Sequence, residues 1–172
     1  MIASQIRDIV VPLDEYPKVH EEATLHDAFV ALNAGYASGK RYRHLLVLNR
    51  QDQLVGLLGI HDLLRGLFPD YLRTGEGGRH AYAGPVPDFP ALTLVWAETC
   101  REQCPVAAGK PVREFMSPVL AKVGPDDPIT KAAYLMVIHD KSMLPVAAGD
   151  RLVGVVRLID VFNEATKVVL HD

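Results

Sequence analysis

The chain has 172 residues, a formal net charge of −3 and an apolar fraction of 49%, which together describe a globular protein. No stretch approaches the roughly eighteen consecutive apolar residues of a membrane span, and no basic segment followed by an apolar run opens the chain, so we expect a cytoplasmic location. The mild acidity argues against a nucleic-acid partner, and two cysteines are too few for a disulfide scaffold.

The chain contains two copies of one sequence pattern. The segment LVGLLGIHD at 54–62 returns as LVGVVRLID at 152–160. In each copy an apolar strand contains a glycine, and an aspartate follows where a helix is expected to begin. Further blocks match upstream of this motif: 6–12 with 112–118, 19–28 with 123–132, and 44–47 with 143–146. The repetition predicts two like folding units, each with a ligand site after its apolar strand.

The predicted elements of the second copy follow the order β-α-β-β-α. Asp127 is expected to cap a helix that Pro128 opens, and residues 148–151 are expected to form a hairpin turn. The elements are strand 119–123, a helix with Ala132, Leu135, Met136 and His139 on one face, strands 144–147 and 152–156, and a last helix with Val161, Phe162 and Ala165. The first copy follows the same order, with a Gly/Ser-rich loop at 35–39.

An insert at 69–109 separates the two copies. It begins as a Gly/Pro-rich loop, of a length that is usually functional or mobile, and continues into a helix at about 89–104 that Asp88 starts and Pro105 ends. One stripe of this helix consists of Leu92, Val95, Trp96, Thr99, Cys100 and Cys104. We expect the helix to cover the core of the module or a partner subunit.

The two cysteines of this helix, Cys100 and Cys104, share one face. A structural zinc needs four ligands, and His80 is the one nearby candidate for a third, so no metal site is expected. Helical neighbours at this spacing have Cβ atoms ~5–6 Å apart, which exceeds the usual range of a disulfide. We therefore expect two small apolar residues that pack beside Trp96.

The order of the elements and three phrases, Met116-Ser117-Pro118, LPVA at 144–147 and GVV-x-x-x-D at 154–160, resemble the cystathionine-β-synthase (CBS) domain family. The resemblance covers roughly residues 1–68 and 110–168. It implies an α/β (α+β) fold in which two CBS repeats, 1–68 and 110–172, pack with pseudo-two-fold symmetry as a Bateman module, together with the helix of the insert. It also implies a homodimer.

Asp62 and Asp160 are the principal candidate site residues. The resemblance implies that they bind the ribose of an adenosyl ligand, since a carboxylate can accept hydrogen bonds from both ribose hydroxyls. The alternative is that each aspartate caps its helix, for which this residue type is among the best. Both interpretations stay open from the sequence.

The chain departs from the family pattern three residues before each aspartate, where ligand-binding CBS domains usually carry Thr or Ser. Gly59 stands there in the first copy and would leave the amides at the helix N-terminus accessible to a phosphate. Arg157 stands there in the second copy and would either bind a phosphate or fill the pocket. The two sites are therefore expected to differ.

The residues before the central strand complete the predicted site. By resemblance, this position often lines the pocket, and the two copies carry different residues there. The further candidates are Arg43 and His44 in the first copy, Ser142 and Met143 in the second, and His61 and Val123.

The sequence thus predicts a regulatory module that binds an adenosyl-containing nucleotide, of the AMP, ATP or S-adenosylmethionine class, in the cleft between its repeats. No further domain is left in the chain, so we expect it to signal to a regulated protein in trans. No Ser/His/Asp or Cys/His arrangement indicates an enzyme. The alternative is a structural or interaction scaffold that has lost nucleotide binding, with Gly59 and Arg157 as traces of the loss.

Overall fold

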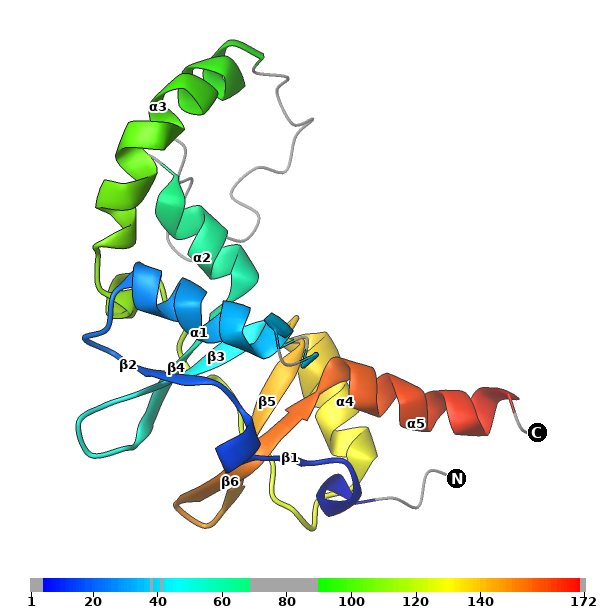
Figure 1. Ribbon diagram of the computed structural model, residues 1–172. Helices are drawn as coiled ribbons and strands as arrows, with labels where there is room; N and C mark the ends of the chain where they lie inside the picture. Colours follow the sequence, from blue (N-terminus) through cyan, green and yellow to red (C-terminus); the bar gives the residue numbers. More distant parts are fainter. Residues whose placement is uncertain (1–4, 38, 41, 69–89, 171–172) are drawn as a thin grey trace. The chain divides into compact units, whose positions relative to one another are not determined.

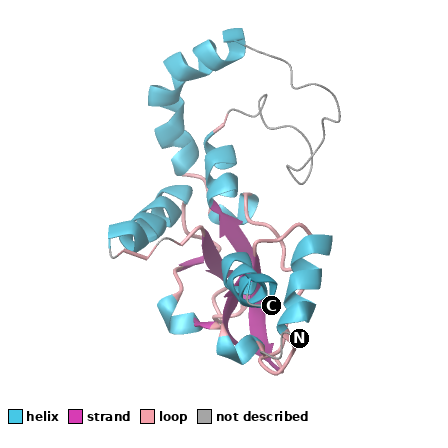
Figure 2. Ribbon diagram, turned by 90° about the vertical axis from the view of Figure 1, so that its right-hand side faces the viewer, coloured by secondary structure: helices cyan, strands magenta, loops and turns pink. Residues whose placement is uncertain are grey.

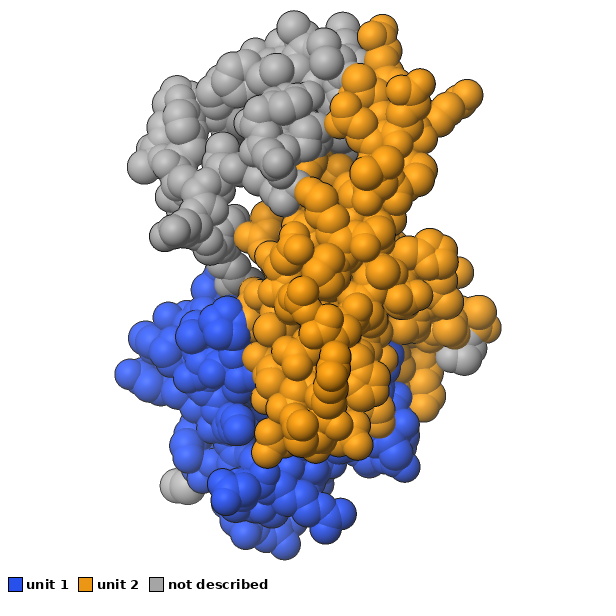
Figure 3. Space-filling view, turned by 90° about the vertical axis from the view of Figure 1, so that its left-hand side faces the viewer, with its two compact units in different colours: residues 1–17, 118–172 blue, residues 18–117 orange. Residues whose placement is uncertain are grey.

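The computed structural model describes residues 5–37, 39–40, 42–68 and 90–170 (Figure 1). The chain divides into two compact units (Figure 3). Unit 1 contains residues 1–17 and 118–172, and unit 2 contains residues 18–117. Unit 2 therefore holds most of the first sequence copy, and unit 1 most of the second. Each unit combines strands with helices (Figure 2, strands magenta and helices cyan).

Unit 2 contains a three-stranded sheet in the order β2-β3-β4. β2 runs parallel to β3, and β3 pairs antiparallel with β4, so α1 provides the crossover between parallel neighbours. Residues 45–48 of β3 are all buried, as expected for a central strand. The elements are β2 (Lys18–His20), α1 (Leu25–Ala37), β3 (His44–Leu48), β4 (Leu54–Gly59), α2 (Ile60–Leu67), α3 (Pro90–Ala108) and a 3₁₀ turn, η4 (Val112–Glu114). This confirms the predicted β-α-β-β-α order.

Unit 1 contains a three-stranded antiparallel sheet in the order β1-β6-β5. Its elements are η1 (Ile6–Asp8), β1 (Val11–Pro12), η2 (Leu13–Glu15), α4 (Ile129–Ile138), β5 (Met143–Ala148), β6 (Arg151–Arg157) and α5 (Leu158–Leu170). Gly149, with φ of 62°, lies in the predicted hairpin turn between β5 and β6. The core is formed by Ile6, Val123, Ile129, Ala132, Met136, Leu144, Val146, Val156 and Val161.

Each unit contains a short segment from the beginning of the other sequence copy. In unit 1, Val11 and Pro12 of β1 pair with Val155 and Gly154 of β6. In unit 2, Ser117 and Leu57 exchange two backbone hydrogen bonds of 2.8 and 2.9 Å. The compact units therefore differ in their boundaries from the repeats at 1–68 and 110–172, because strand pairing assigns these segments to the opposite copy.

The repeated glycine of the motif makes room for these segments. A Cβ atom on Gly154 would overlap the carbonyl oxygen of Val11 and lie 2.8 Å from Cγ2 of Val10. A Cβ atom on Gly56 would lie 2.5 Å from Sδ of Met116. Both distances are too short for real carbon atoms, so both copies require glycine for packing.

Two local expectations for the second copy are wrong. Residues 119–123 form no strand, since Val123 makes one isolated bridge with Val146. α4 begins at Ile129 with Pro128 at the N-cap position, and the Asp127 carboxylate instead accepts the Gly124 N–H at 2.7 Å. Asp127 thus closes the turn before the helix, because proline already occupies the cap.

Helix boundaries differ from expectation at two further places. The predicted loop at 35–39 is partly helical, because α1 continues through Ala37. α3 continues to Ala108 and contains Pro105, which was expected to end it. Proline removes one internal hydrogen bond, but the residues that follow it still adopt helical conformation. Asp88, the predicted start of this helix, lies outside the described residues, as does His80.

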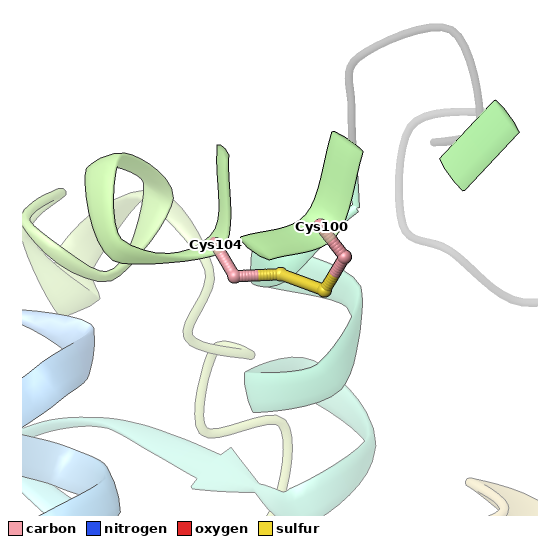
Figure 4. The surroundings of a disulfide bond; sticks show 2 residues. All are labelled: Cys100 and Cys104. Carbon is pink, nitrogen blue, oxygen red and sulfur yellow. A yellow bond between two sulfur atoms is a disulfide. The ribbon is translucent and has the colours of Figure 1, made fainter. Parts of the chain in front are cut away.

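The expectation of free cysteines is also wrong, because Cys100 and Cys104 form a disulfide (Figure 4). Their Cα atoms are 5.1 Å apart, whereas a regular helix with a 1.5 Å rise and a 2.3 Å radius would place them about 6.2 Å apart. The backbone has therefore drawn in by about 1 Å at this turn, and the observed separation lies within the usual disulfide range. The adjoining Pro105 weakens the same turn, since the Arg101 carbonyl loses its amide donor.

The charge of Asp127 predicts a measurable dependence of stability on pH. The Lys131 ammonium, 2.7 Å away, and the Gly124 N–H hold the pKa of Asp127 below its ordinary value of 3.8. The stabilisation is present above pH 3.8 and is lost as the pH falls through the lower, folded-state pKa. We expect Asp127→Asn to cost about 1 kcal/mol at pH 7. Urea unfolding from pH 7 to pH 2 should show this difference from wild type shrinking in acid, and a constant difference would contradict it.

Candidate functional site

The predicted site residues lie where a strand leads directly into a helix. β4 ends at Gly59 and α2 begins at the next residue, and β6 ends at Arg157 and α5 begins at the next residue. The first helical N–H is bonded in each case to a residue before the neighbouring strand: Ile60 N–H donates to the Arg43 carbonyl at 3.0 Å, and Leu158 N–H donates to the Ser142 carbonyl at 2.8 Å. These bonds explain why residues distant in sequence share each junction. We call them junction A, in unit 2, and junction B, in unit 1.

Junction A brings His44, Gly59 and Asp62 together. His44 lies opposite Gly59 in the β3–β4 register. A Cβ atom on Gly59 would lie 3.1 Å from Cδ2 and 3.4 Å from Nε2 of His44, and 3.5 Å from Oδ2 of Asp62. The imidazole and the carboxylate therefore each lie beside the bare backbone of Gly59. A side chain at position 59 would have to push the histidine aside.

Asp62 uses one carboxylate oxygen to hold the start of α2. The Gly59 N–H donates to Oδ2 at 2.9 Å, while Gly59 itself occupies the N-cap position. Asp62 thus stabilises the helix from its third residue, as the acidic residue of a capping box does. Oδ1 has a longer, 3.4 Å contact with Arg65, whose guanidinium also donates to the Phe115 carbonyl at 3.2 Å. The Asp62 side chain is 17% exposed.

Junction B differs in that its aspartate is engaged by Arg157. Nε of Arg157 donates to Oδ2 of Asp160 at 2.6 Å, and its Nη2 donates to Oδ1 at 2.7 Å. This bidentate pair uses both carboxylate oxygens, and Asp160 is 16% exposed. In the structure the Arg157 guanidinium therefore lies against the Asp160 carboxylate. Met143, opposite Arg157 in the strand register, is buried.

The remaining predicted residues are placed less centrally. The side chains of Arg43, His61 and Ser142 are exposed beside their junctions. Val123 is buried, and its backbone bonds to β5 through Pro145 and Ala147 at 3.0 and 2.9 Å, so its side chain belongs to the core. Arg65 was missed by the sequence reasoning. Its spacing of three residues from Asp62 on the helix could have indicated the contact.

An apolar groove lies beside junction A, between α1 and α2. Its volume is about 260 Å³, and Ile60, which follows Gly59 directly, forms part of its wall. The groove is lined by Phe29, Leu32, Asn33, Ile60, Leu63 and Leu64. Asp62 is not among these lining residues, and at 3.6 residues per turn it lies on the other side of α2 from Ile60, Leu63 and Leu64.

The described parts of the chain contain neither a candidate metal-binding group nor a candidate membrane-spanning helix. Among these residues there is no group of three or more His, Cys, Asp or Glu side chains that could hold a metal ion. Within the same residues, no helix is both long enough and apolar enough to cross a bilayer.

Comparison with known proteins gives one family. The model of the CBS domain matches residues 6–68 and 112–167. No curated protein sequence matches the chain at a significant level.

Solved structures share the fold at low sequence identity. The crystal structure of CBSX2 in complex with AMP is 22% identical, with 96% of this chain and 98% of that chain covered and a TM-score of 0.61. The CBS domain of a membrane protein from Sphaerobacter thermophilus is 20% identical, with coverage of 94% and 88% and a TM-score of 0.65. The cytosolic domain of the Mg²⁺ channel MgtE in complex with ATP is 22% identical, with coverage of 90% and 46% and a TM-score of 0.57.

Proposed function

Because the chain belongs to the CBS-domain family, we propose that it is a regulatory module that binds an adenine nucleotide at junction A. The family match covers both sequence copies. Two structures that share its fold were solved with AMP and with ATP. The observation that carries the proposal for this chain is the difference between the two aspartates. Oδ1 of Asp62 has a 3.4 Å contact with Arg65, whereas both carboxylate oxygens of Asp160 accept bonds of 2.6 and 2.7 Å from Arg157.

The chemistry of junction A fits a nucleoside. Oδ1 of Asp62 would accept hydrogen bonds from ribose hydroxyls, while Oδ2 keeps its bond to the Gly59 N–H. The N-terminus of α2 favours anionic groups.

Junction B is proposed to be closed to the same ligand. A nucleotide there would have to separate Arg157 from Asp160, two partly buried charges joined by two short hydrogen bonds. Breaking such a pair without an equal replacement is costly. This ion pair also favours the alternative function, a non-binding scaffold, but for the second copy alone.

Signalling would follow from differential affinity. A nucleotide that prefers one conformation of the protein shifts the population toward it, and a regulated protein in trans would recognise that conformation. We also propose a homodimer. Apolar side chains on α4 and α5 support it, since Tyr134, Val137 and Phe162 are 63%, 76% and 61% exposed.

A thermal-shift panel on the full chain tests the proposal. AMP, ADP, ATP and S-adenosylmethionine should be compared at increasing concentration. A nucleotide present at 100 times its Kd should stabilise the fold by about 2.7 kcal/mol. Inorganic phosphate and adenine-free ribose phosphate serve as controls and should give no comparable shift. No shift of the unfolding temperature with any of the four ligands would contradict nucleotide binding and favour the scaffold.

A further inference from the structure

We propose that Cys100 and Cys104 form a reversible thiol–disulfide site that sets the helical pitch of α3. The bond joins adjacent turns of one helix (Figure 4). A disulfide stabilises a fold most when it closes a long loop of the unfolded chain. Cys100 and Cys104 are four residues apart and close a very short loop, so the bond adds little stability in this way. The bond holds no distant segments of the chain together, so its formation would chiefly affect α3 itself.

The pair is suited to exchange with an external disulfide. Both cysteines are partly exposed, so a small oxidant or reductant can reach them. They are the two cysteines of the whole chain, so an intramolecular disulfide has no alternative pairing. Their closeness gives the second thiol a high effective concentration once the first has reacted.

The reaction proposed is two-step exchange with a small-molecule disulfide such as glutathione disulfide. One cysteine thiolate attacks a sulfur of the oxidant, forms a mixed disulfide and releases one thiolate of the oxidant. The other cysteine thiolate then attacks the sulfur of the first cysteine and displaces the second thiolate. The protein loses two protons and two electrons, and the oxidant is reduced to two thiols.

Oxidation would change the geometry of α3 at the turn before Pro105. The Cα atoms of the disulfide are 5.1 Å apart, about 1 Å less than in a regular helix. Reduction removes the bond that draws this turn in and lets it return toward the regular pitch.

The rest of unit 2 would register that change. The segment that follows α3 is bonded to the segment where α1 begins. Leu25 N–H donates to the Lys110 carbonyl at 2.9 Å, and Val112 N–H donates to the Ala23 carbonyl at 2.8 Å. With this end fixed, a change of pitch shifts the part of α3 that precedes Cys104. α3 packs against α2 as well as α1, so the shift would reach the helix that carries Asp62.

The test uses the full chain in its oxidised and reduced forms, without a nucleotide. Equilibration with glutathione disulfide should lower the number of titratable thiols from two to zero, and dithiothreitol should restore both. Hydrogen exchange of amides in α3 should differ severalfold between the two forms. Cys100→Ser and Cys104→Ser are the matched controls: each should retain glutathione as a mixed disulfide and show no second displacement.

Three results would overturn the inference. Two thiols that persist in glutathione disulfide would show that the bond does not form by exchange. A bond that resists dithiothreitol in the folded protein would be a fixed structural bond. Equal exchange of α3 amides in both forms would show that the bond does not alter the helix. None of these outcomes depends on nucleotide binding, so they are separable from the proposed function.

Discussion

Replacing Gly154 with alanine is expected to lower the free energy of unfolding by about 3 kcal/mol. The added methyl group would overlap the carbonyl oxygen of Val11 and lie 2.8 Å from Cγ2 of Val10. Neither contact is with the free end of a flexible side chain. Relief therefore requires β1 to move away from β6, with loss of the Val11–Val155 and Pro12–Gly154 pairing. Urea unfolding monitored by circular dichroism measures the effect.

Gly56→Ala is the matched control, because it alters the equivalent residue of the first copy. The methyl group there meets Sδ of Met116 at 2.5 Å, and a methionine side chain can rotate away. We expect a smaller loss, about 1 kcal/mol. Equal losses at the two positions would show that the backbone contact at Gly154 is not the cause.

Replacing Arg157 with threonine is expected to raise the number of nucleotides bound per chain from one to two. The substitution removes the guanidinium that holds both oxygens of Asp160 at 2.6 and 2.7 Å. It also places a hydroxyl three residues before the aspartate, where the family pattern has one. Isothermal titration with the nucleotide identified by the thermal-shift panel gives the stoichiometry directly.

The reciprocal variant, Gly59→Arg, should abolish binding at junction A. It places an arginine three residues before Asp62, in the arrangement that Arg157 and Asp160 now have. The cost in stability should be modest, since the new Cβ atom meets the His44 ring at 3.1 Å and a small rotation of the ring relieves the contact. An unchanged stoichiometry in Arg157→Thr, together with unchanged affinity in Gly59→Arg, would show that this position does not control access.

Much of the fold follows from local sequence signals. The repeat of 54–62 at 152–160 identified two like units. The pattern of apolar strands and helical faces gave the β-α-β-β-α order of the first copy and the α-β-β-α part of the second. Ala132 and Met136, expected on one face of a helix, are both buried. The helices and strands were predictable because the pattern that indicates each one lies within that element.

The features that were not predicted depend on contacts between distant residues, on distortion of a helix, or on the orientation of a side chain. The sequence does not reveal that the motif glycine is needed for packing, because Gly154 is required by Val11, which lies far away in the sequence. Regular helix geometry argues against a Cys100–Cys104 bond, but the helix is distorted at this turn. The pairing of Arg157 with Asp160 depends on a side-chain orientation that spacing alone left open.

The central claim is that junction A binds an adenine nucleotide through Asp62 and junction B does not. Isothermal titration of the full chain with AMP or ATP, compared among wild type, Asp62→Asn and Asp160→Asn, tests it most directly. Asparagine can still accept the Gly59 N–H, so α2 should remain capped while the carboxylate is lost. We predict one nucleotide per chain in wild type, an affinity at least about tenfold weaker in Asp62→Asn, a loss of roughly 1.4 kcal/mol, and little change in Asp160→Asn. Full affinity in Asp62→Asn, or two equal sites in wild type, would contradict the claim.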